Sequence, residues 1–142
     1  MNLFTSFQIS GSALTAEKLR LDVIAGNIAN MSTTRTAAGG PYRRRTVAFA
    51  EDLAASRGRN DSVSFHGRGV RVDRIYADHR PPQLVFDPDH PDAGEDGYVR
   101  YPNIELAKEM TDMITALRSY EANTTAVNTA KSLYLKALEI GR

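Results

Sequence analysis

The 142-residue chain contains no cysteine and no tryptophan, and it has no long apolar run. Without cysteine it can form no disulfide, no thiolate metal site and no cysteine nucleophile. No stretch approaches the roughly 18 apolar residues of a membrane-spanning helix, so we expect no membrane insertion. The first ten residues, MNLFTSFQIS, have no basic start and no continuous apolar segment. We therefore expect no cleavable signal peptide.

The charge is small overall but unevenly distributed. The formal net charge is +1 at pH 7, which argues against a dedicated nucleic-acid binder. Residues 31–82 nevertheless hold ten arginines against five acids, whereas residues 83–112 hold eight acids against two basic residues. The split is compatible with nucleic-acid binding through the arginine-rich segment 35–80, although no aromatic stacking platform accompanies it. Two other interpretations are complementary patches that orient neighbouring subunits and a solvated surface with internal pairing.

The N-terminal segment 1–31 predicts one long helix. Phe7, Leu14, Leu21 and Ile28 recur every seven residues, which is typical of a helical stripe with heptad character. Small residues lie among the large ones and would let another helix approach closely. Further apolar residues fall off the stripe, so we expect more than one face of this helix to be buried.

The C-terminal segment 103–142 predicts a second, longer helix. Pro102 would precede it, Asn103 would cap it and Gly141 would end it. The expected contact face comprises Ala107, Met110, Ile114, Leu117, Glu121, Thr124, Val127 and Asn128, flanked by Met113 and Tyr120.

The middle segment 32–102 is rich in β-prone runs separated by turn residues. The expected strands are Thr46–Phe49, Val63–Phe65, Gly69–Tyr76, Gln83–Phe86 and Gly97–Tyr101. The predicted fold class is therefore α+β, with long terminal helices packed as a coiled-coil-like hairpin around a small β-rich insert. Two helices alone cannot cover apolar surface on several faces, so we expect other copies or related chains to cover it.

No catalytic, cofactor-binding or metal site is predicted. The acidic stretch 87–96 superficially resembles a calcium-binding loop, but positions six and twelve of such a loop require Gly and Glu, and here they hold Asp92 and Tyr98. The three histidines lack the spacing of metal ligands. A solvated acidic turn and hydrogen-bonded loop histidines are the better interpretations.

Both ends of the chain resemble the flagellar basal-body rod protein family. The resemblance is carried by SALTA at 12–16, RLDV at 20–23 and NIAN at 27–30, and by RSYEAN at 118–123. The middle stretch DPDHPDAGEDGYVRYPN at 87–103 resembles the same family.

The resemblance implies a structural subunit of the periplasm-spanning rod and no enzymatic activity. It implies export through the flagellar type III apparatus without a cleaved signal, and assembly with copies of itself and other rod proteins. It implies no cofactor, no small-molecule substrate, no nucleic acid and no membrane insertion. The alternative is a stand-alone helical module that binds one partner helix.

The expected assembly interface lies on both helices. It comprises Phe7, Leu14, Leu21, Asn27, Ile28, Asn30, Met110, Met113, Leu117, Tyr120, Asn123 and Val127. The large apolar residues would be anchors, with Tyr120 the strongest hot-spot candidate. Asn27 and Asn123 are interpreted as buried amides that fix register, the alternative being helix-end caps or exposed amides. We expect the helices to be poorly ordered in the free subunit and to order on docking.

Overall fold

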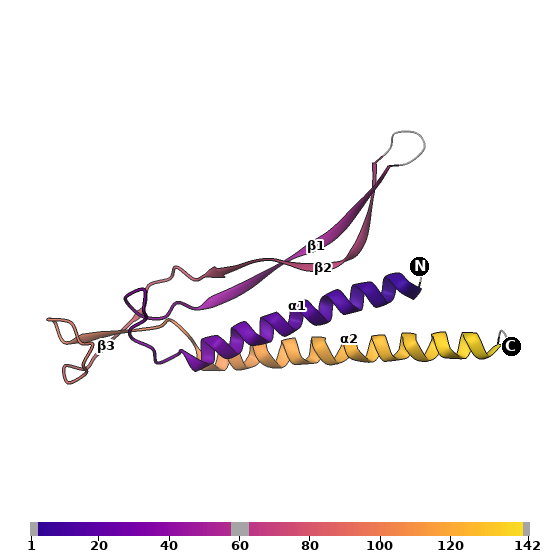
Figure 1. Cartoon of the computed structure of the whole chain (residues 1–142). Coiled ribbons are helices and arrows are strands. Elements are labelled where there is room, and N and C mark those ends of the chain that lie inside the picture. The colour runs from indigo at the N-terminus through magenta and orange to yellow at the C-terminus, as the bar shows by residue number, and fades with distance from the viewer. Residues whose placement is uncertain (1–2, 58–62, 141–142) are drawn as a thin grey trace.

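The computed structural model describes residues 3–57 and 63–140. The elements are, in chain order, α1 (Leu3–Ala29), β1 (Arg45–Arg57), β2 (Val63–Ala77), β3 (Gln83–Phe86), β4 (Tyr98–Tyr101) and α2 (Leu106–Ile140). The two helices run antiparallel and side by side, and the β1–β2 ribbon lies along α1 (Figure 1). The α+β class and the hairpin of terminal helices are confirmed.

The two helices begin and end close to the predicted positions, with one difference. After α1, the backbone N–H of Asn30 donates to Gly26 O at 3.2 Å, which closes the last turn. In α2 the N–H of Glu109 donates to Glu105 O at 3.0 Å, so the first turn starts from Glu105. The prediction that Asn103 caps this helix is wrong, because the helix begins at Leu106 and the cap position falls on Glu105. The side-chain amide of Asn103 donates to Pro81 O at 3.3 Å. Gly141, the expected helix end, lies outside the described residues.

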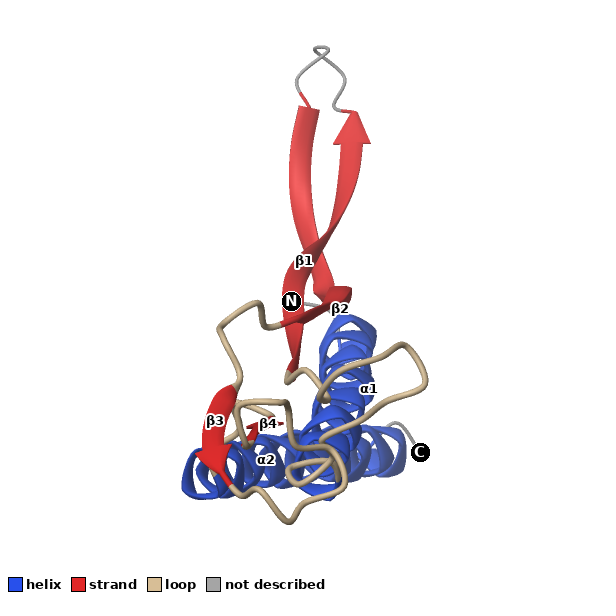
Figure 2. Ribbon diagram, turned by 90° about the vertical axis from the view of Figure 1, so that its left-hand side faces the viewer, coloured by secondary structure: helices blue, strands red, loops and turns tan. Residues whose placement is uncertain are grey.

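The β-rich insert forms two separate two-stranded antiparallel sheets. β1 and β2 pair from Arg45↔Ala77 to Arg57↔Val63, with register shifts between Ala48 and Phe49 and between Asp52 and Leu53. The runs Val63–Phe65 and Gly69–Tyr76, predicted as separate strands, are one strand of 15 residues. Gly67, which lies between them, does not break the strand, since the irregularity is absorbed by a bulge. The ribbon stands away from the helical hairpin at its far end (Figure 2).

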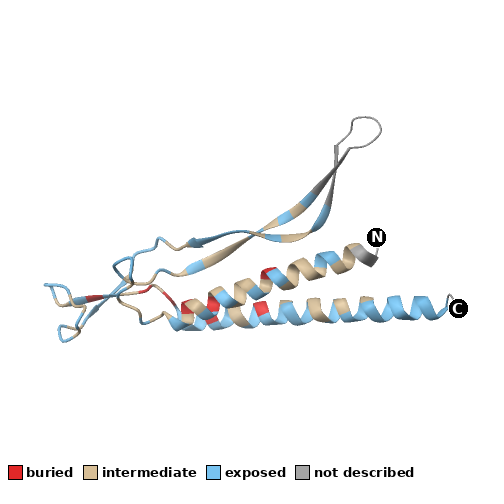
Figure 3. Cartoon of the chain, in the orientation of Figure 1, coloured by how far each residue is buried: buried red, intermediate tan, exposed pale blue. Residues whose placement is uncertain are grey.

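The buried residues of the helices gather where α1 ends and α2 begins (Figure 3). Ala16, Ile24 and Asn27 of α1 and Glu109 and Ala116 of α2 are buried. The two alanines allow close approach of the helix backbones. The half-buried or buried residues of α2 are Glu109, Asp112, Met113, Ala116, Ser119, Asn123, Thr124, Val127 and Ala130.

The face of α2 that packs inward differs from the stripe that the sequence predicts. Only Thr124, Val127 and the flanking Met113 of that set are half-buried. The remaining members are exposed, and they are Ala107, Met110, Ile114, Leu117, Tyr120, Glu121 and Asn128. The helix therefore turns small and polar residues toward α1 and leaves its larger apolar residues outside.

Candidate assembly surface

Asn27, in the last turn of α1, is fully buried and uses its whole hydrogen-bonding capacity. Its Nδ2 donates to Arg45 O at 2.8 Å and to Glu109 Oε2 at 3.0 Å. Its Oδ1 accepts from the backbone N–H of Arg45 at 2.9 Å and from the hydroxyl of Tyr42 at 3.2 Å. A side-chain amide has two donors and two main acceptor positions, and all four are occupied. One residue thus joins α1, α2 and the start of β1.

Glu109, in the first turns of α2, brings a carboxylate into the same buried position. Its side chain is 0% exposed, and its Oε1 accepts from Arg44 Nε at 2.5 Å. Arg44 also donates to Asp112 Oδ2 at 3.3 Å and to Thr46 Oγ1 at 2.9 Å. An unpaired buried carboxylate would be strongly unfavourable, so the guanidinium and the Asn27 amide are what permit this burial. We call Asn27, Tyr42, Arg44 and Glu109 the junction network.

A second contact fixes the ribbon on α1. The hydroxyl of Ser12 accepts from the backbone N–H of Val70 at 3.0 Å and donates to Ile9 O at 2.7 Å. Gly69 lies directly over this hydroxyl, with φ +142°. A Cβ at this position would overlap the Ser12 side chain. The close approach of strand and helix therefore requires glycine here.

The outward face of α2 carries large apolar side chains that the described part of this chain leaves exposed. Near the junction these residues are Met110, Ile114, Leu117 and Tyr120. Toward the C-terminal end they are Leu133, Leu135, Leu138 and Ile140, the last 86% exposed. Helix α2 has 35 residues against 27 in α1, and its C-terminal end extends past α1 (Figure 1). Contiguous exposed apolar surface of this kind marks an interaction site.

The residues predicted as the assembly interface occupy three environments within the single chain. Phe7, Leu14, Leu21 and Ile28 are half-buried on α1, as are Met113 and Val127 on α2. Met110, Leu117 and Tyr120 are exposed. Asn27 is buried in the junction network, whereas Asn30 donates to Gly26 O and Asn123 donates to Ser119 O, each at 2.9 Å. Their role between chains stays a prediction.

Sequence reasoning missed Arg44 and Glu109. Glu109 lies among apolar residues near the start of a helix, where a carboxylate is also explained by the helix dipole. Arg44 is one of three consecutive arginines, and nothing local distinguishes it from Arg43 or Arg45. The sequence offered one signal. Asn27 of α1 was interpreted as a buried amide, and a buried amide needs polar partners on neighbouring elements.

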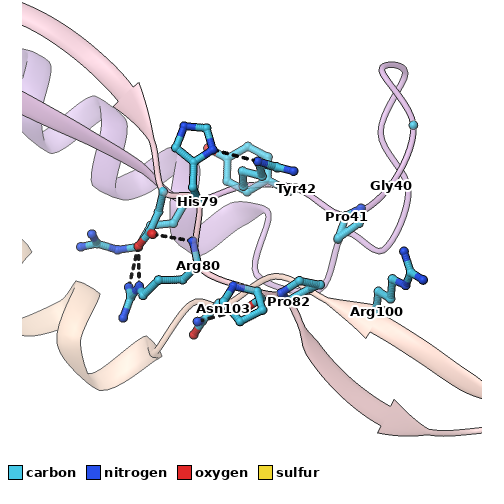
Figure 4. A pocket seen from close by; sticks show the side chains of 13 residues that line it. Gly40, Pro41, Tyr42, His79, Arg80, Pro82, Arg100 and Asn103 are labelled. Atoms are coloured by element: carbon cyan, nitrogen blue, oxygen red, sulfur yellow. Dashed lines mark hydrogen bonds and ion pairs between the residues drawn. The ribbon is translucent and has the colours of Figure 1, made fainter.

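A basic cavity of about 390 Å³ lies beside the junction, between the loop before β1 and the segment after β2. Its lining includes four arginines, Arg43, Arg44, Arg80 and Arg100, against one carboxylate, Asp78 (Figure 4). Arg80 donates to Asp78 Oδ2 at 2.7 Å, and this hydrogen bond lowers the pKa of Asp78 from 3.8 to about 2.

The described residues offer no group of three or more potential metal ligands. Nor, within that part of the chain, does either helix combine the length and apolar character needed to cross a membrane.

Two family models match the ends of the chain that build the hairpin. One, described as "Flagella basal body rod protein", matches residues 7–35. The other, described as "Flagellar basal body rod FlgEFG protein C-terminal", matches residues 95–140. Both define the class as flagellar rod proteins.

Curated relatives named "Flagellar basal-body rod protein FlgC" match along the whole chain. The one from Borreliella burgdorferi is 44% identical, covering 99% of this chain and 98% of the relative. The ones from Bacillus subtilis and Salmonella typhimurium are 43% and 38% identical, each covering 100% of both chains. The chain therefore belongs to the FlgC family of flagellar basal-body rod proteins, and its role is that of a structural rod subunit. This family implies a non-enzymatic role and assembly with other rod components.

Proposed function

We propose that this chain polymerises through its two terminal helices into the rod, the drive shaft that spans the periplasm and transmits torque. In this proposal residues 1–31 and 103–142 form the rod core and residues 32–102 lie outside it. The chain is exported through the flagellar type III apparatus without a cleaved signal. Its partners are copies of itself and other rod proteins.

The exposed apolar face of α2 is the observation that carries this proposal. Met110, Leu117 and Tyr120 are 51%, 44% and 36% exposed, whereas Met113, in the same part of the helix, is half-buried. In a protein that worked alone, this surface would stay in contact with water at a cost of about 25 cal/mol for each Å². Packing against neighbouring helices removes that cost, and repeated head-to-tail contacts of this type build helical assemblies.

The two asparagines expected to fix register have different surroundings. Asn27 already has four partners within the chain, so we propose that it fixes the register of α1 against α2. Within the described residues, the Asn123 side chain bonds one turn back along its own helix, to Ser119 O, and its side-chain oxygen is available for a neighbouring chain. With Asn123→Leu, rods should still form but should be poorly ordered. Unchanged motility would show that Asn123 does not fix the register between chains.

Substitution of the outward face tests the proposal directly. Leu117→Glu should abolish rod assembly in a strain that lacks its own copy, because a charge then lies in every helix contact. The matched control is Arg118→Glu, at the next exposed position of the same helix. Basal bodies isolated from both strains report the outcome. Normal rods in the Leu117→Glu strain would show that this face makes no contact between subunits.

Hydrogen exchange separates the proposal from a stand-alone module. If residues 131–140 order on docking, their backbone amide hydrogens should exchange fast in the dilute chain. The same amides should become protected after co-assembly with rod partners. Protection of this segment in the dilute chain would favour the stand-alone module.

A further inference from the structure

The basic cavity has more positive charge than its own chain neutralises. Arg80 is paired with Asp78, at 2.6 Å from Nη2 to Oδ2, and Arg44 is held by Glu109 and Asp112. Arg43 lies against the ring of His79, with 3.1 Å between Nη1 and Nδ1. Within the described residues, neither Arg43 nor Arg100 forms an ion pair with an acid. Two guanidinium groups of the lining are therefore available to an anionic partner.

The same end of the molecule carries an excess of carboxylates. The loop between β3 and β4, residues 87–97, contains five acids and no lysine or arginine. Asp92 accepts from Thr34 Oγ1 at 2.7 Å and lies 3.9 Å from Arg35. The loop lines a second cavity, which shares Gly40, Pro41 and Arg100 with the basic one, and no residue of 87–97 lines the basic cavity itself. Asp89, Glu95 and Asp96 remain exposed and, within the described chain, unpaired.

We infer that the basic cavity receives the acidic loop 87–97 of a second copy of this chain. The inference rests on the proposed function, since it describes a contact between neighbouring rod subunits. The basic cavity and the acidic loop both lie at the β3–β4 end of an elongated molecule (Figure 1). In copies that pack side by side in parallel, the cavity of one is therefore level with the loop of the next along the long axis. Each copy gives a loop and receives one, which is a heterologous contact that continues around a helix. Complementary charge at such a contact fixes the orientation of the neighbours and excludes inverted ones.

The shape of the two surfaces supports this occupant. A cavity of about 390 Å³ is within the range of sites that hold small ligands, and it admits the tip of a loop with two or three side chains. Three prolines of the lining, Pro41, Pro81 and Pro82, restrict the backbone around the cavity. Figure 4 shows Pro41 and Pro82 on different segments of the chain. A preformed lining of this kind loses little conformational freedom when the partner arrives.

Charge reversal tests the inference in cells that lack the chromosomal copy. Arg43→Glu with Arg100→Glu should reduce the number of rods per cell about tenfold or more, because carboxylates then face carboxylates. Asp89→Lys with Glu95→Lys should do the same, and a chain with all four changes should recover. The matched control is Arg71→Glu with Arg74→Glu, two exposed positions on the ribbon. Recovery in the four-fold variant supports the pairing, and its absence overturns it.

A cross-link distinguishes a second copy from the same chain. Since the protein has no cysteine, Arg43→Cys and Glu95→Cys can be produced together on separate chains. A disulfide that joins the two variant chains in isolated rods is expected. Rods that contain both chains without this bond would overturn the inference and leave the proposed function intact. If the native chain, without either cysteine, is itself not found in isolated rods, the proposed function is contradicted.

Discussion

The two ends of the helical hairpin differ in how their side chains are packed. At the junction end, where α1 stops and α2 starts, Asn27 and Glu109 are fully buried, and every hydrogen-bonding group of the Asn27 side chain has a partner in the same chain. At the free end, Leu135, Leu138 and Ile140 are exposed apolar side chains on a helix that extends past its partner. The junction network is complete within the chain, whereas the free end, like the outward face of α2, has apolar surface left to bury.

The difference shows which interactions serve folding and which are left for assembly. A buried, fully paired polar network is specific, because a shift of either helix by one residue would leave several of its groups unsatisfied. Contacts between exposed apolar side chains do not depend on hydrogen-bond geometry, so this surface can adapt to a neighbouring chain. We therefore expect substitutions in the junction network to change the stability of the free chain, and substitutions at the free end or on the outward face of α2 to change assembly.

Asn27→Asp should have the largest effect on the free chain. The new carboxylate keeps the shape of the side chain, but it cannot donate to Glu109 Oε2 or to Arg45 O, and it places a second negative charge beside Glu109. The loss of free energy of unfolding should be about 3–5 kcal/mol, as for other uncompensated buried charges. Urea unfolding followed by circular dichroism measures it.

The matched control for this substitution is Asn128→Asp, at an exposed position of α2, which should change stability by less than about 0.5 kcal/mol. Equal stabilities of the two variants would mean that the junction network contributes nothing to folding.

Gly69→Ala should have the next largest effect, because it acts on the contact between the ribbon and α1. The new Cβ meets the Ser12 hydroxyl, and φ +142° is unfavourable for any residue with a side chain. A loss of about 1–3 kcal/mol is expected from such strain. Gly67→Ala is the control, since a Cβ there meets no atom within 4 Å and the backbone needs no positive φ. If both variants melt at the same temperature, the ribbon is not held at Ser12.

The sequence predicted the elements whose signals are local and periodic. The seven-residue spacing of Phe7, Leu14, Leu21 and Ile28 was sufficient for α1, and β3 was predicted with its observed bounds. It did not predict the long ribbon, since no strand is expected over 66–68, which include Gly67, and the register shift that carries β2 through this stretch depends on its pairing with β1.

The pairing of Arg44 with Glu109 was equally out of reach. The two residues are 65 positions apart, so no periodicity connects them, and each has an ordinary explanation in its own segment. The outward face of α2 was read correctly as apolar but not distinguished from the face that packs on α1. The side chains that decide this, Ala116 and Glu109, are a small one and a charged one, and a hydrophobic pattern gives neither of them weight.

Leu138→Glu should barely affect the free chain. The side chain is 55% exposed and lies in the part of α2 where every residue from 131 to 140 is exposed. We expect a change in the free energy of unfolding within about 0.5 kcal/mol, as for surface substitutions, together with weaker incorporation into rods. Sedimentation of co-assembled rod proteins measures the incorporation. A free chain strongly destabilised by this change would mean that the free end is already covered in solution.

The smallest effect on the free chain should come from Asp78, whose ion pair with Arg80 is close to the surface. The hydrogen bond from Arg80 lowers the pKa of Asp78 from 3.8 to about 2 in the folded chain, so the unfolded chain takes up this proton first as the pH falls. The contribution of the pair is fully present above about pH 4 and is lost as the pH falls through about 2. Asp78→Asn should remove this acid-dependent component, while Asp73→Asn, at an exposed position of β2, should leave it in place. Acid titrations of the melting temperature that coincide for the native chain and Asp78→Asn would show that this pair does not contribute to the stability of the fold.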